Sequence, residues 1–375
     1  MQKSRNLLKL ATAAALLTLL PAACGGDPAV TESGSTEEPA EEGTGGGGDV
    51  GEIEGDDVHI VFGHYLPSGA GTAPEEHFAE LIEEYTAGTV TVEIGYSESL
   101  GGADELIYLV EEGAVDMAAV VPAFTPDAFP AASITQMIWW SSQVDETDLR
   151  RQHDLIMEMH SMDLIEQELA DYNVRRTMVQ NLPPYYLFSD GADCTIDGIS
   201  GDRIRSLGTE YPQMLKAIGA APVEMVTAEI YEALERGTLD RASLPPDVFL
   251  DFDMASVAPD ACGPIFWLGA GHQILLNMDT WGELSSDQQE AIDRAAMEAQ
   301  EWSIDYYIER QEDLLAQLEE DGVEVQAMAE DEFAEWQERS PDFADQWLKR
   351  MQDAGNGDAA QEIYDKLREI EQREY

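Results

Sequence analysis

A pattern of alternating strands and helices occurs twice in this chain and constrains its fold more than any other feature. The first copy has strands at 58–63, 90–95 and 115–121, with helices at 74–86 and 104–112 between them. Apolar residues recur at every second position in the strands and at every third or fourth in the helices. A βαβαβ unit of this kind predicts a parallel sheet, because each crossover returns the chain in the same direction.

The second copy repeats this layout with strands at 203–207, 222–226 and 239–244. Gly113 and Gly237 occupy equivalent places at the end of the second helix in each copy. Two such units predict an α/β protein with two doubly wound domains. Ligands of these domains bind beyond the carboxyl ends of the strands, so we expect a ligand cleft between the two domains.

A long helix is predicted after the second copy. Ser285 and Gln288 form the sequence pattern of a capping box, and the helical pattern then continues without interruption to Gly322. At 1.5 Å per residue this helix is about 50 Å long, so we expect it to span both domains. Peripheral helices rich in charge are expected at 331–374.

The chain is expected to cross between the domains more than once. Gly269-Ala270-Gly271 is interpreted as a kink where a strand crosses. We assign 58–180 plus 270–308 to the first domain and 181–269 plus 309–375 to the second.

The N-terminal segment has the features of a targeting sequence. Residues 1–23 have basic residues, then an apolar run too short to span a membrane comfortably, then small residues. The sequence around Cys24 resembles a bacterial lipobox, although Pro21 stands where an aliphatic residue is usual. We therefore predict a lipoprotein signal peptide and lipidation of Cys24; an ordinary signal peptide is the alternative. Residues 24–57 are rich in Gly and Glu and are predicted to form a disordered acidic tether.

The charge of the chain excludes several functions. It contains 76 Asp and Glu but only 20 Lys and Arg, which gives a net charge of −56. A surface of this kind repels polyanions, so nucleic-acid binding and electrostatic docking to anionic lipids are excluded as main functions. The acidity is typical of a surface that remains soluble in high salt.

Four stretches together resemble the substrate-binding proteins of tripartite ATP-independent periplasmic (TRAP) transporters, the DctP-type family. In chain order they are Ser99–Met117, with its Leu-Gly-Gly and Gly-x-x-Asp-Met pattern, Asp197–Arg205, Ile218–Asp240, and Leu276–Ser285. The resemblance covers the chain from about Val58 to Gly322 and depends on the order and spacing of these stretches.

The resemblance implies a fold like that of type II periplasmic binding proteins and a role as a solute receptor, not an enzyme. Such a receptor closes around an organic acid and delivers it to the small and large membrane subunits of a permease driven by an ion gradient. It would be exported and either periplasmic or anchored by lipid to the outer face of the cytoplasmic membrane. No cofactor is implied.

Arg205 matches the arginine that typically binds the substrate carboxylate in this family. Its guanidinium presents two N–H groups to one carboxylate and stays charged when it is buried. The alternative is that Arg205 lies at the surface or pairs with one of the abundant acidic residues.

The other expected ligand contacts are aromatic or apolar. The sequence lacks the second arginine that many members carry near 181–186, and it has Leu244-Pro245 where the family has polar residues. A monocarboxylate with an apolar body therefore fits better than a dicarboxylate. Trp267 belongs either to the cleft or to the core. The candidate lining residues are Tyr65, Phe124, Tyr185, Leu244, Phe249 and Trp267.

Other chemical signals are weak. If Cys24 is lipidated, Cys194 and Cys262 remain as an even pair outside the cytoplasm, and we predict a disulfide between them. The six histidines show no metal-binding spacing, so no metal site is predicted.

Two other functions remain possible from the sequence. An ABC-type solute-binding lipoprotein would share the two-domain architecture, although the long helix and its junction at 276–285 favour the TRAP family. An extracellular hydrolase would need a pair of carboxylates in the cleft, and no motif locates such a pair.

Overall fold

The computed structural model describes residues 53–141, 146–191 and 193–374. The expected signal peptide, Cys24 and the tether as far as residue 52 lie outside this part of the chain. Within the described ranges no helix is both long and apolar enough to cross a membrane.

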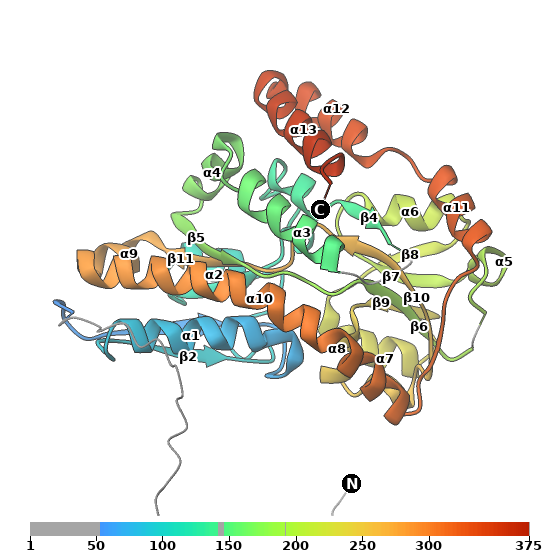
Figure 1. Cartoon of the computed structure of the whole chain (residues 1–375), viewed down its shortest axis with the longest axis horizontal. Helices are drawn as coiled ribbons and strands as arrows, with labels where there is room; N and C mark the ends of the chain where they lie inside the picture. The colour runs from blue at the N-terminus through green and yellow to red at the C-terminus, as the bar shows by residue number, and fades with distance from the viewer. Residues whose placement is uncertain (1–52, 142–145, 192, 375) are drawn as a thin grey trace, which may run out of the picture. The chain divides into compact units, whose positions relative to one another are not determined.

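The two copies of the sequence pattern form two sheets of the same topology (Figure 1). In the first copy, β1 (Val58–Gly63) lies between β2 (Val90–Gly95) and β3 (Met117–Val120) and pairs in parallel with both. The crossovers are made by α1 (Ala73–Tyr85) and α2 (Leu106–Glu111).

In the second copy, β7 (Arg203–Ser206) lies between β8 (Ala221–Glu224) and β9 (Arg241–Leu244), again in parallel. Helices α6 (Tyr211–Ala217) and α7 (Ile230–Glu235) connect these strands. The predicted repeat of βαβαβ units is thus confirmed.

The helices before β3 and β9 end in the same way. Gly113 and Gly237 follow them with φ values of 69° and 60°. A residue with a Cβ rarely adopts this left-handed conformation, which explains why both copies have glycine here.

Both sheets are mixed, whereas the sequence pattern predicted parallel sheets. In the first sheet, β11 (Gln273–Asn277) runs antiparallel to β3 and to β5 (Val174–Val179). In the second, β6 (Tyr185–Ser189) runs antiparallel to β9 and to β10 (Asp260–Leu268). The chain passes from the first sheet to the second between β5 and β6, and returns from the second to the first between β10 and β11. The two crossings run in opposite directions, so β11 is antiparallel to β5 and β10 is antiparallel to β6.

The two crossing segments lie side by side. The N–H of Gln180 donates to the carbonyl of His272 at 2.8 Å, and the N–H of Gly271 donates to the carbonyl of Gln180 at 2.9 Å. A Cβ on Gly271 would lie 2.7 Å from the Gln180 carbonyl oxygen, so only glycine fits there. The predicted strand-crossing kink at 269–271 is confirmed.

The full strand orders add one edge strand, in the second sheet. The first sheet has the order β2-β1-β3-β11-β5, and the second has β12-β10-β6-β9-β7-β8, where β12 is Glu324–Gln326. A further strand, β4 (Ile138–Trp140), pairs antiparallel with β10. The expected domain limits placed 138–140 in the first domain, but this pairing attaches it to the second sheet.

The long helix is present as α10 (Ser286–Glu320), with a capping box formed by Ser285 and Gln288. It packs against α1 and β5 of the first domain and against α8 (Pro246–Asp251) and β12 of the second. Figure 1 shows it running along both sheets, as the length of its pattern predicts.

The remaining helices cover the sheets and connect the strands. They are η1 (Ala70–Thr72), η2 (Pro122–Phe124), η3 (Ala132–Gln136), α3 (Glu146–Met159), α4 (Asp163–Ala170), α5 (Ile196–Ile199), η4 (Thr227–Glu229), η5 (Met254–Ser256), α9 (Met278–Glu283), α11 (Glu330–Arg339), α12 (Phe343–Asp353) and α13 (Gly357–Glu371).

The C-terminal helices are less peripheral than expected, because Trp336 and Trp347 are fully buried. Their indole N–H groups donate to the carbonyls of Met214 at 2.9 Å and Pro130 at 3.0 Å.

A disulfide joins Cys194 to Cys262 on β10, with 5.2 Å between the Cα atoms. The bridge closes a loop with a sequence separation of 68 residues. A cross-link over such a loop contributes ~2–4 kcal/mol, mainly because it restricts the unfolded chain.

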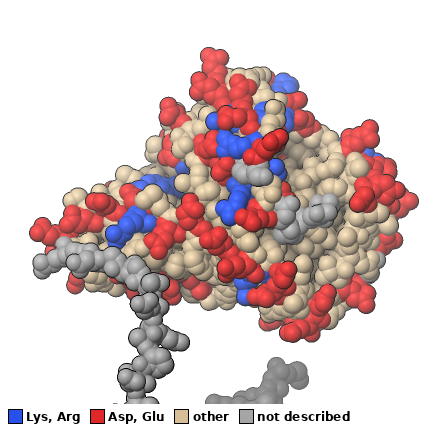
Figure 2. Space-filling view, viewed as in Figure 1, with Lys and Arg blue, Asp and Glu red and all other residues tan. Residues whose placement is uncertain are grey.

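The charge of the chain is visible on its surface. Figure 2 shows acidic side chains over much of the visible face, with fewer basic side chains between them. This distribution fits the solvated acidic surface expected from composition.

Candidate functional site

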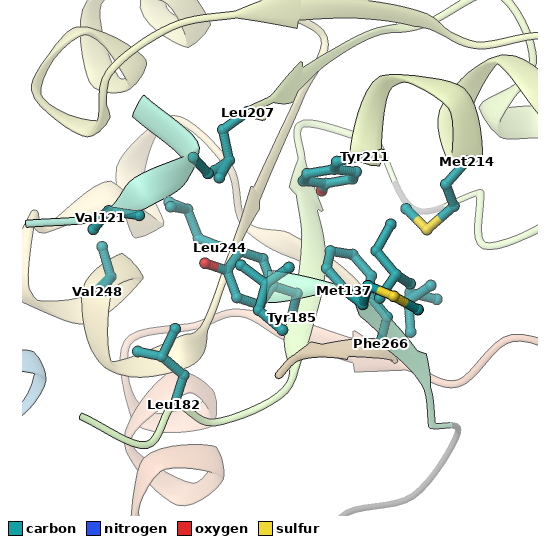
Figure 3. Close-up of a cluster of buried hydrophobic side chains, with 14 of the residues drawn as sticks. Val121, Met137, Leu182, Tyr185, Leu207, Tyr211, Met214, Leu244, Val248 and Phe266 are labelled. Carbon is teal, nitrogen blue, oxygen red and sulfur yellow. The ribbon is translucent and has the colours of Figure 1, made fainter. Parts of the chain in front are cut away.

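A small cavity lies between the two sheets, beside the crossing segments. Its volume is about 20 Å³, which is room for about one water molecule. In this conformation the cavity has no room for a larger ligand. Figure 3 shows part of the apolar cluster around it. The lining residues come from both sheets and from the crossings: Tyr65, Val121, Phe124, Gln136, Leu182, Tyr185, Arg205, Leu207, Thr227, Leu244, Pro245, Val248, Leu268, Ala270, Gly271 and His272.

Arg205 is the central charged residue of this cavity. It lies on β7 and is 2% exposed. Its guanidinium donates to the carbonyls of Met225 and Ser243 at 3.3 Å and to the Thr227 hydroxyl at 3.4 Å. These bonds are longer than the usual 2.9–3.0 Å, and all three acceptors are neutral.

No carboxylate among the described residues forms an ion pair with Arg205. Its neighbours differ: Arg203 pairs with Asp240 and Arg241 with Asp202, each at 2.7 Å. A buried cation without a counter-ion is unfavourable, and in a chain with this excess of acidic residues it is unexpected. The geometry therefore fits an anion-binding site.

Aromatic rings pack beside the guanidinium. The Cζ atom of Arg205 lies 5.9 Å from the centre of the Phe124 ring, and the Tyr65 ring meets Phe124 edge-on at 5.6 Å. Burial raises the pKa of Tyr185 to about 12, although the nearby Arg205 opposes this shift. The phenol therefore remains protonated and neutral at physiological pH.

A larger hollow on the first domain is a weaker candidate for an anion site. It has a volume of about 400 Å³ and contains Arg175 and Arg176. Both arginines already have carboxylate partners, Asp293 at 2.6 Å and Glu166, respectively. Its positive charge is therefore neutralised within the protein.

Five of the seven residues proposed from the sequence line the cavity: Arg205, Tyr65, Phe124, Tyr185 and Leu244. Phe249 and Trp267 do not. Phe249 is fully buried and stacks on Phe188, with the ring centres 3.9 Å apart. Trp267 packs in a separate apolar cluster with Leu149, Ile304 and Tyr307.

The positions of Phe249 and Trp267 have a simple geometric cause. Successive side chains of a strand point to opposite faces, so Leu268 lines the cavity while Trp267 points away from it. On α8, Val248 lines the cavity, and Phe249 lies 100° further around the helix.

The sequence analysis missed three polar lining residues, Gln136, Thr227 and His272. Thr227 follows the end of β8, so the rule that ligands lie beyond strand ends could have found it. His272 had no local signal, because its partner Glu75 is 197 residues away in the sequence.

His272 belongs to a buried cluster with His64 and Glu75 that has the composition of a metal site. The Nδ1 of His272 lies 2.8 Å from Oε1 of Glu75, and the Nε2 of His64 lies 3.8 Å from the same oxygen. However, the Nδ1 of His64 accepts a hydrogen bond from the N–H of Leu66 at 3.1 Å.

This bond places the proton of a neutral His64 on Nε2, where it points toward Glu75 and leaves no lone pair for a metal. Burial lowers the pKa of His64, which favours this neutral form. Burial also opposes ionisation of Glu75, but the hydrogen bond from His272 and the nearby imidazole of His64 hold its pKa below the usual value. The cluster is therefore better described as a carboxylate that accepts a hydrogen bond from His272, with the N–H of His64 pointing toward the same oxygen at 3.8 Å.

Comparisons with known proteins agree with this fold. The model of a family described as bacterial extracellular solute-binding protein, family 7 (DctP), matches residues 62–160 and 194–350, more than half of the chain. The C4-dicarboxylate-binding periplasmic protein DctP of Rhodobacter capsulatus is 23% identical over 301 residues, which are 78% of this chain and 87% of that protein.

An uncharacterised protein of Salmonella typhimurium, YiiZ, is 27% identical over 168 residues, 44% of this chain. This match spans only 50% of the length of the Salmonella protein. A crystal structure of a TRAP periplasmic solute-binding protein from Desulfovibrio salexigens with bound orotic acid has a TM-score of 0.72 at 20% identity, covering 83% of this chain and 98% of that one. The predicted fold, with two α/β domains, is confirmed.

Proposed function

Because the chain belongs to the DctP family of bacterial extracellular solute-binding proteins, we propose that it captures an organic acid with one carboxylate and an apolar body. In this proposal it delivers the acid to the membrane subunits of a TRAP permease driven by an ion gradient. It acts as a receptor and catalyses no reaction.

The observation that carries this proposal is the buried guanidinium of Arg205, which has no carboxylate partner among the described residues. A carboxylate supplied by the ligand would accept two of its N–H groups and provide the missing charge. The longer bonds to Met225, Ser243 and Thr227 hold the guanidinium in place without neutralising it.

The rest of the cavity supports a single carboxylate and an apolar body. Arg205 is the only lysine or arginine among the lining residues, so a second carboxylate would find no cation there. Most other lining groups are apolar, including Val121, Leu182 and Leu244. The solute-binding protein from Desulfovibrio salexigens has bound orotic acid, which also carries a single carboxylate.

A thermal-stability screen tests this substrate class. We expect 4-methylpentanoate, phenylacetate or orotate to raise the melting temperature, whereas the corresponding amides do not. A ligand at a hundredfold excess over its Kd stabilises the folded state by about 2.7 kcal/mol. Succinate serves as the dicarboxylate control and should have a smaller effect. Stabilisation by sugars or cationic amino acids, with none by carboxylates, would contradict the proposal.

The proposed delivery to a TRAP permease is based on the family, and the neighbouring genes test it. Two membrane subunits encoded beside this gene, without an ATPase subunit, would support it. A neighbouring ATPase gene would instead indicate an ABC-type transporter.

We also propose that the mature protein is anchored to the membrane by a lipid on Cys24, because its flanking residues resemble a lipobox. Replacing Cys24 by serine should move the protein from the membrane fraction into the soluble exported fraction. Ser35→Ala, in the tether, is the matched control and should leave fractionation unchanged. Membrane association that persists in Cys24→Ser would refute the anchor.

A further inference from the structure

A chain of hydrogen bonds connects a buried carboxylate to the wall of the cavity. The Oε1 of Glu75 lies 2.8 Å from Nδ1 of His272, and Nε2 of His272 lies 2.7 Å from the hydroxyl of Tyr65. Glu75 is fully buried, His272 is 2% exposed and Tyr65 is 6% exposed. Only His272 and Tyr65 line the cavity, so the chain runs from the interior of the first domain to the ligand site.

The direction of each proton follows from the chemistry of Glu75. An ionised carboxylate can only accept hydrogen bonds, so Nδ1 of His272 must carry a proton. In neutral His272, Nε2 is then an acceptor, and the Tyr65 hydroxyl donates to it. Burial raises the pKa of Tyr65 well above its ordinary value, so this proton stays on the phenol at physiological pH.

The positions of these groups are well determined by their surroundings. His272 directly follows the crossing at Gly271, and its carbonyl accepts the N–H of Gln180 at 2.8 Å. Glu75 lies in the first turn of α1, where the helix dipole favours a negative charge. The N–H of His64 also points toward Glu75, which further favours the ionised form.

With its proton donated to His272, the Tyr65 oxygen offers only lone pairs to the cavity. It lies close to the anion site, because Tyr65 and Arg205 both pack against the Phe124 ring. We propose that Tyr65 accepts a hydrogen bond from a hydroxyl or N–H group of the captured acid, and that His272 and Glu75 impose this role on it. The ligands would then be hydroxy acids or acids with an N–H near the carboxylate. This inference rests on the proposed function.

Three probe acids of nearly the same shape test the role of Tyr65. They are 2-hydroxy-4-methylpentanoate, which carries a donor, 4-methylpentanoate, which has no polar group there, and 4-methyl-2-oxopentanoate, which has only an acceptor. Their Kd values would be measured by calorimetry at pH 8, where histidine side chains ordinarily carry no charge. The hydroxy acid should bind about 5- to 100-fold more tightly than the oxo acid, which leaves the Tyr65 oxygen unsatisfied.

The variant Tyr65→Phe keeps the ring and removes the hydroxyl. In this variant the ratio of the two Kd values should fall to within about threefold of unity. Tighter binding of the oxo acid by the wild type would overturn the proposal, because it would show that Tyr65 donates to the ligand. An unchanged ratio in Tyr65→Phe would also overturn it.

Two substitutions of His272 test its positioning role. In His272→Asn the amide nitrogen takes the place of Nδ1, so it still donates to Glu75 but cannot reach Tyr65. The Tyr65 proton is then free to turn toward the ligand, and the preference for the hydroxy acid should be lost or reversed. In His272→Gln the amide oxygen lies near the place of Nε2 and should restore the preference. A purely structural role would change the affinity for all three acids equally in both variants and would refute the positioning role.

The same titrations separate this inference from the proposed function. If Arg205→Ala abolishes binding of all three acids while Tyr65→Phe leaves their ratio unchanged, the receptor function stands and the role of Tyr65 fails. If none of the three acids binds to the wild type, both proposals fail.

Discussion

Replacing Arg205 by alanine is expected to weaken the binding of a monocarboxylate such as 4-methylpentanoate by roughly 30- to several-thousand-fold. This range corresponds to ~2–5 kcal/mol, the cost of removing one member of a buried, hydrogen-bonded charge pair. The loss should be large because the protein, with a net charge of −56, repels an anion at long range. Affinity must then come from a local contact inside the closed cavity, where screening by salt is weak.

Arg205→Lys distinguishes charge from geometry. The lysine keeps the positive charge but lacks the planar pair of N–H groups, so its affinity should lie between those of the wild type and Arg205→Ala. Folding should be retained, because the alanine variant removes a buried cation that has no carboxylate partner within the described residues.

Arg203→Ala is the matched control for this series. Arg203 lies two residues earlier on β7, its side chain is 43% exposed, and it pairs with Asp240. We expect its substitution to leave the Kd within about threefold of the wild-type value, since exposed ion pairs contribute little. Calorimetric titration of the wild type, Arg205→Ala, Arg205→Lys and Arg203→Ala with the same ligand measures these Kd values. Wild-type affinity in Arg205→Ala would place the carboxylate elsewhere.

Phe249→Ala should destabilise the fold without changing the binding site. Phe249 is fully buried on α8 and stacks on Phe188 across a distance of 3.9 Å between ring centres. Truncating a buried phenylalanine leaves a cavity and costs about 3–5 kcal/mol of unfolding free energy. Urea denaturation should show this loss as a lower midpoint with an unchanged slope.

Phe124→Ala is expected to behave in the opposite way. Phe124 lines the cavity and packs beside Arg205 and Tyr65, and it is only partly buried. Its truncation should weaken ligand binding more than it reduces stability. If Phe249→Ala weakened binding and left stability unchanged, the placement of Phe249 in the core would be wrong.

The success of the sequence analysis depended on how local each signal was. The two βαβαβ units were predictable because apolar spacing and glycines such as Gly113 and Gly237 act within a few residues. The directions of β6 and β11 were not predictable, because they depend on partners far away in the sequence. Both strands are buried at every position, as parallel strands usually are, so their composition gave no sign of the antiparallel pairing.

The same distinction applies to the site. Arg205, which lines the cavity, could be proposed from the sequence because it lies at a strand of the repeat and within a motif of the family. Trp267 and Phe249 are each next to a residue that does line the cavity, Leu268 and Val248, respectively. A shift of one residue is enough to change the face of a strand or helix to which a side chain belongs. His272 and Glu75 come together only in the folded protein, so no spacing rule connects them.

The hydrogen-bonded crossings at Gln180 and Gly271 bear on the order in which contacts with a ligand form. Leu182, Ala270 and His272 lie beside these crossings, which connect the two sheets, so this wall should move least if the domains turn about them. Val121 and Leu207 follow strands of different sheets and should approach each other only as the cleft closes. We therefore expect a ligand to contact the wall beside the crossings first and to be enclosed afterwards. Its residence time would then depend on how often the cleft reopens.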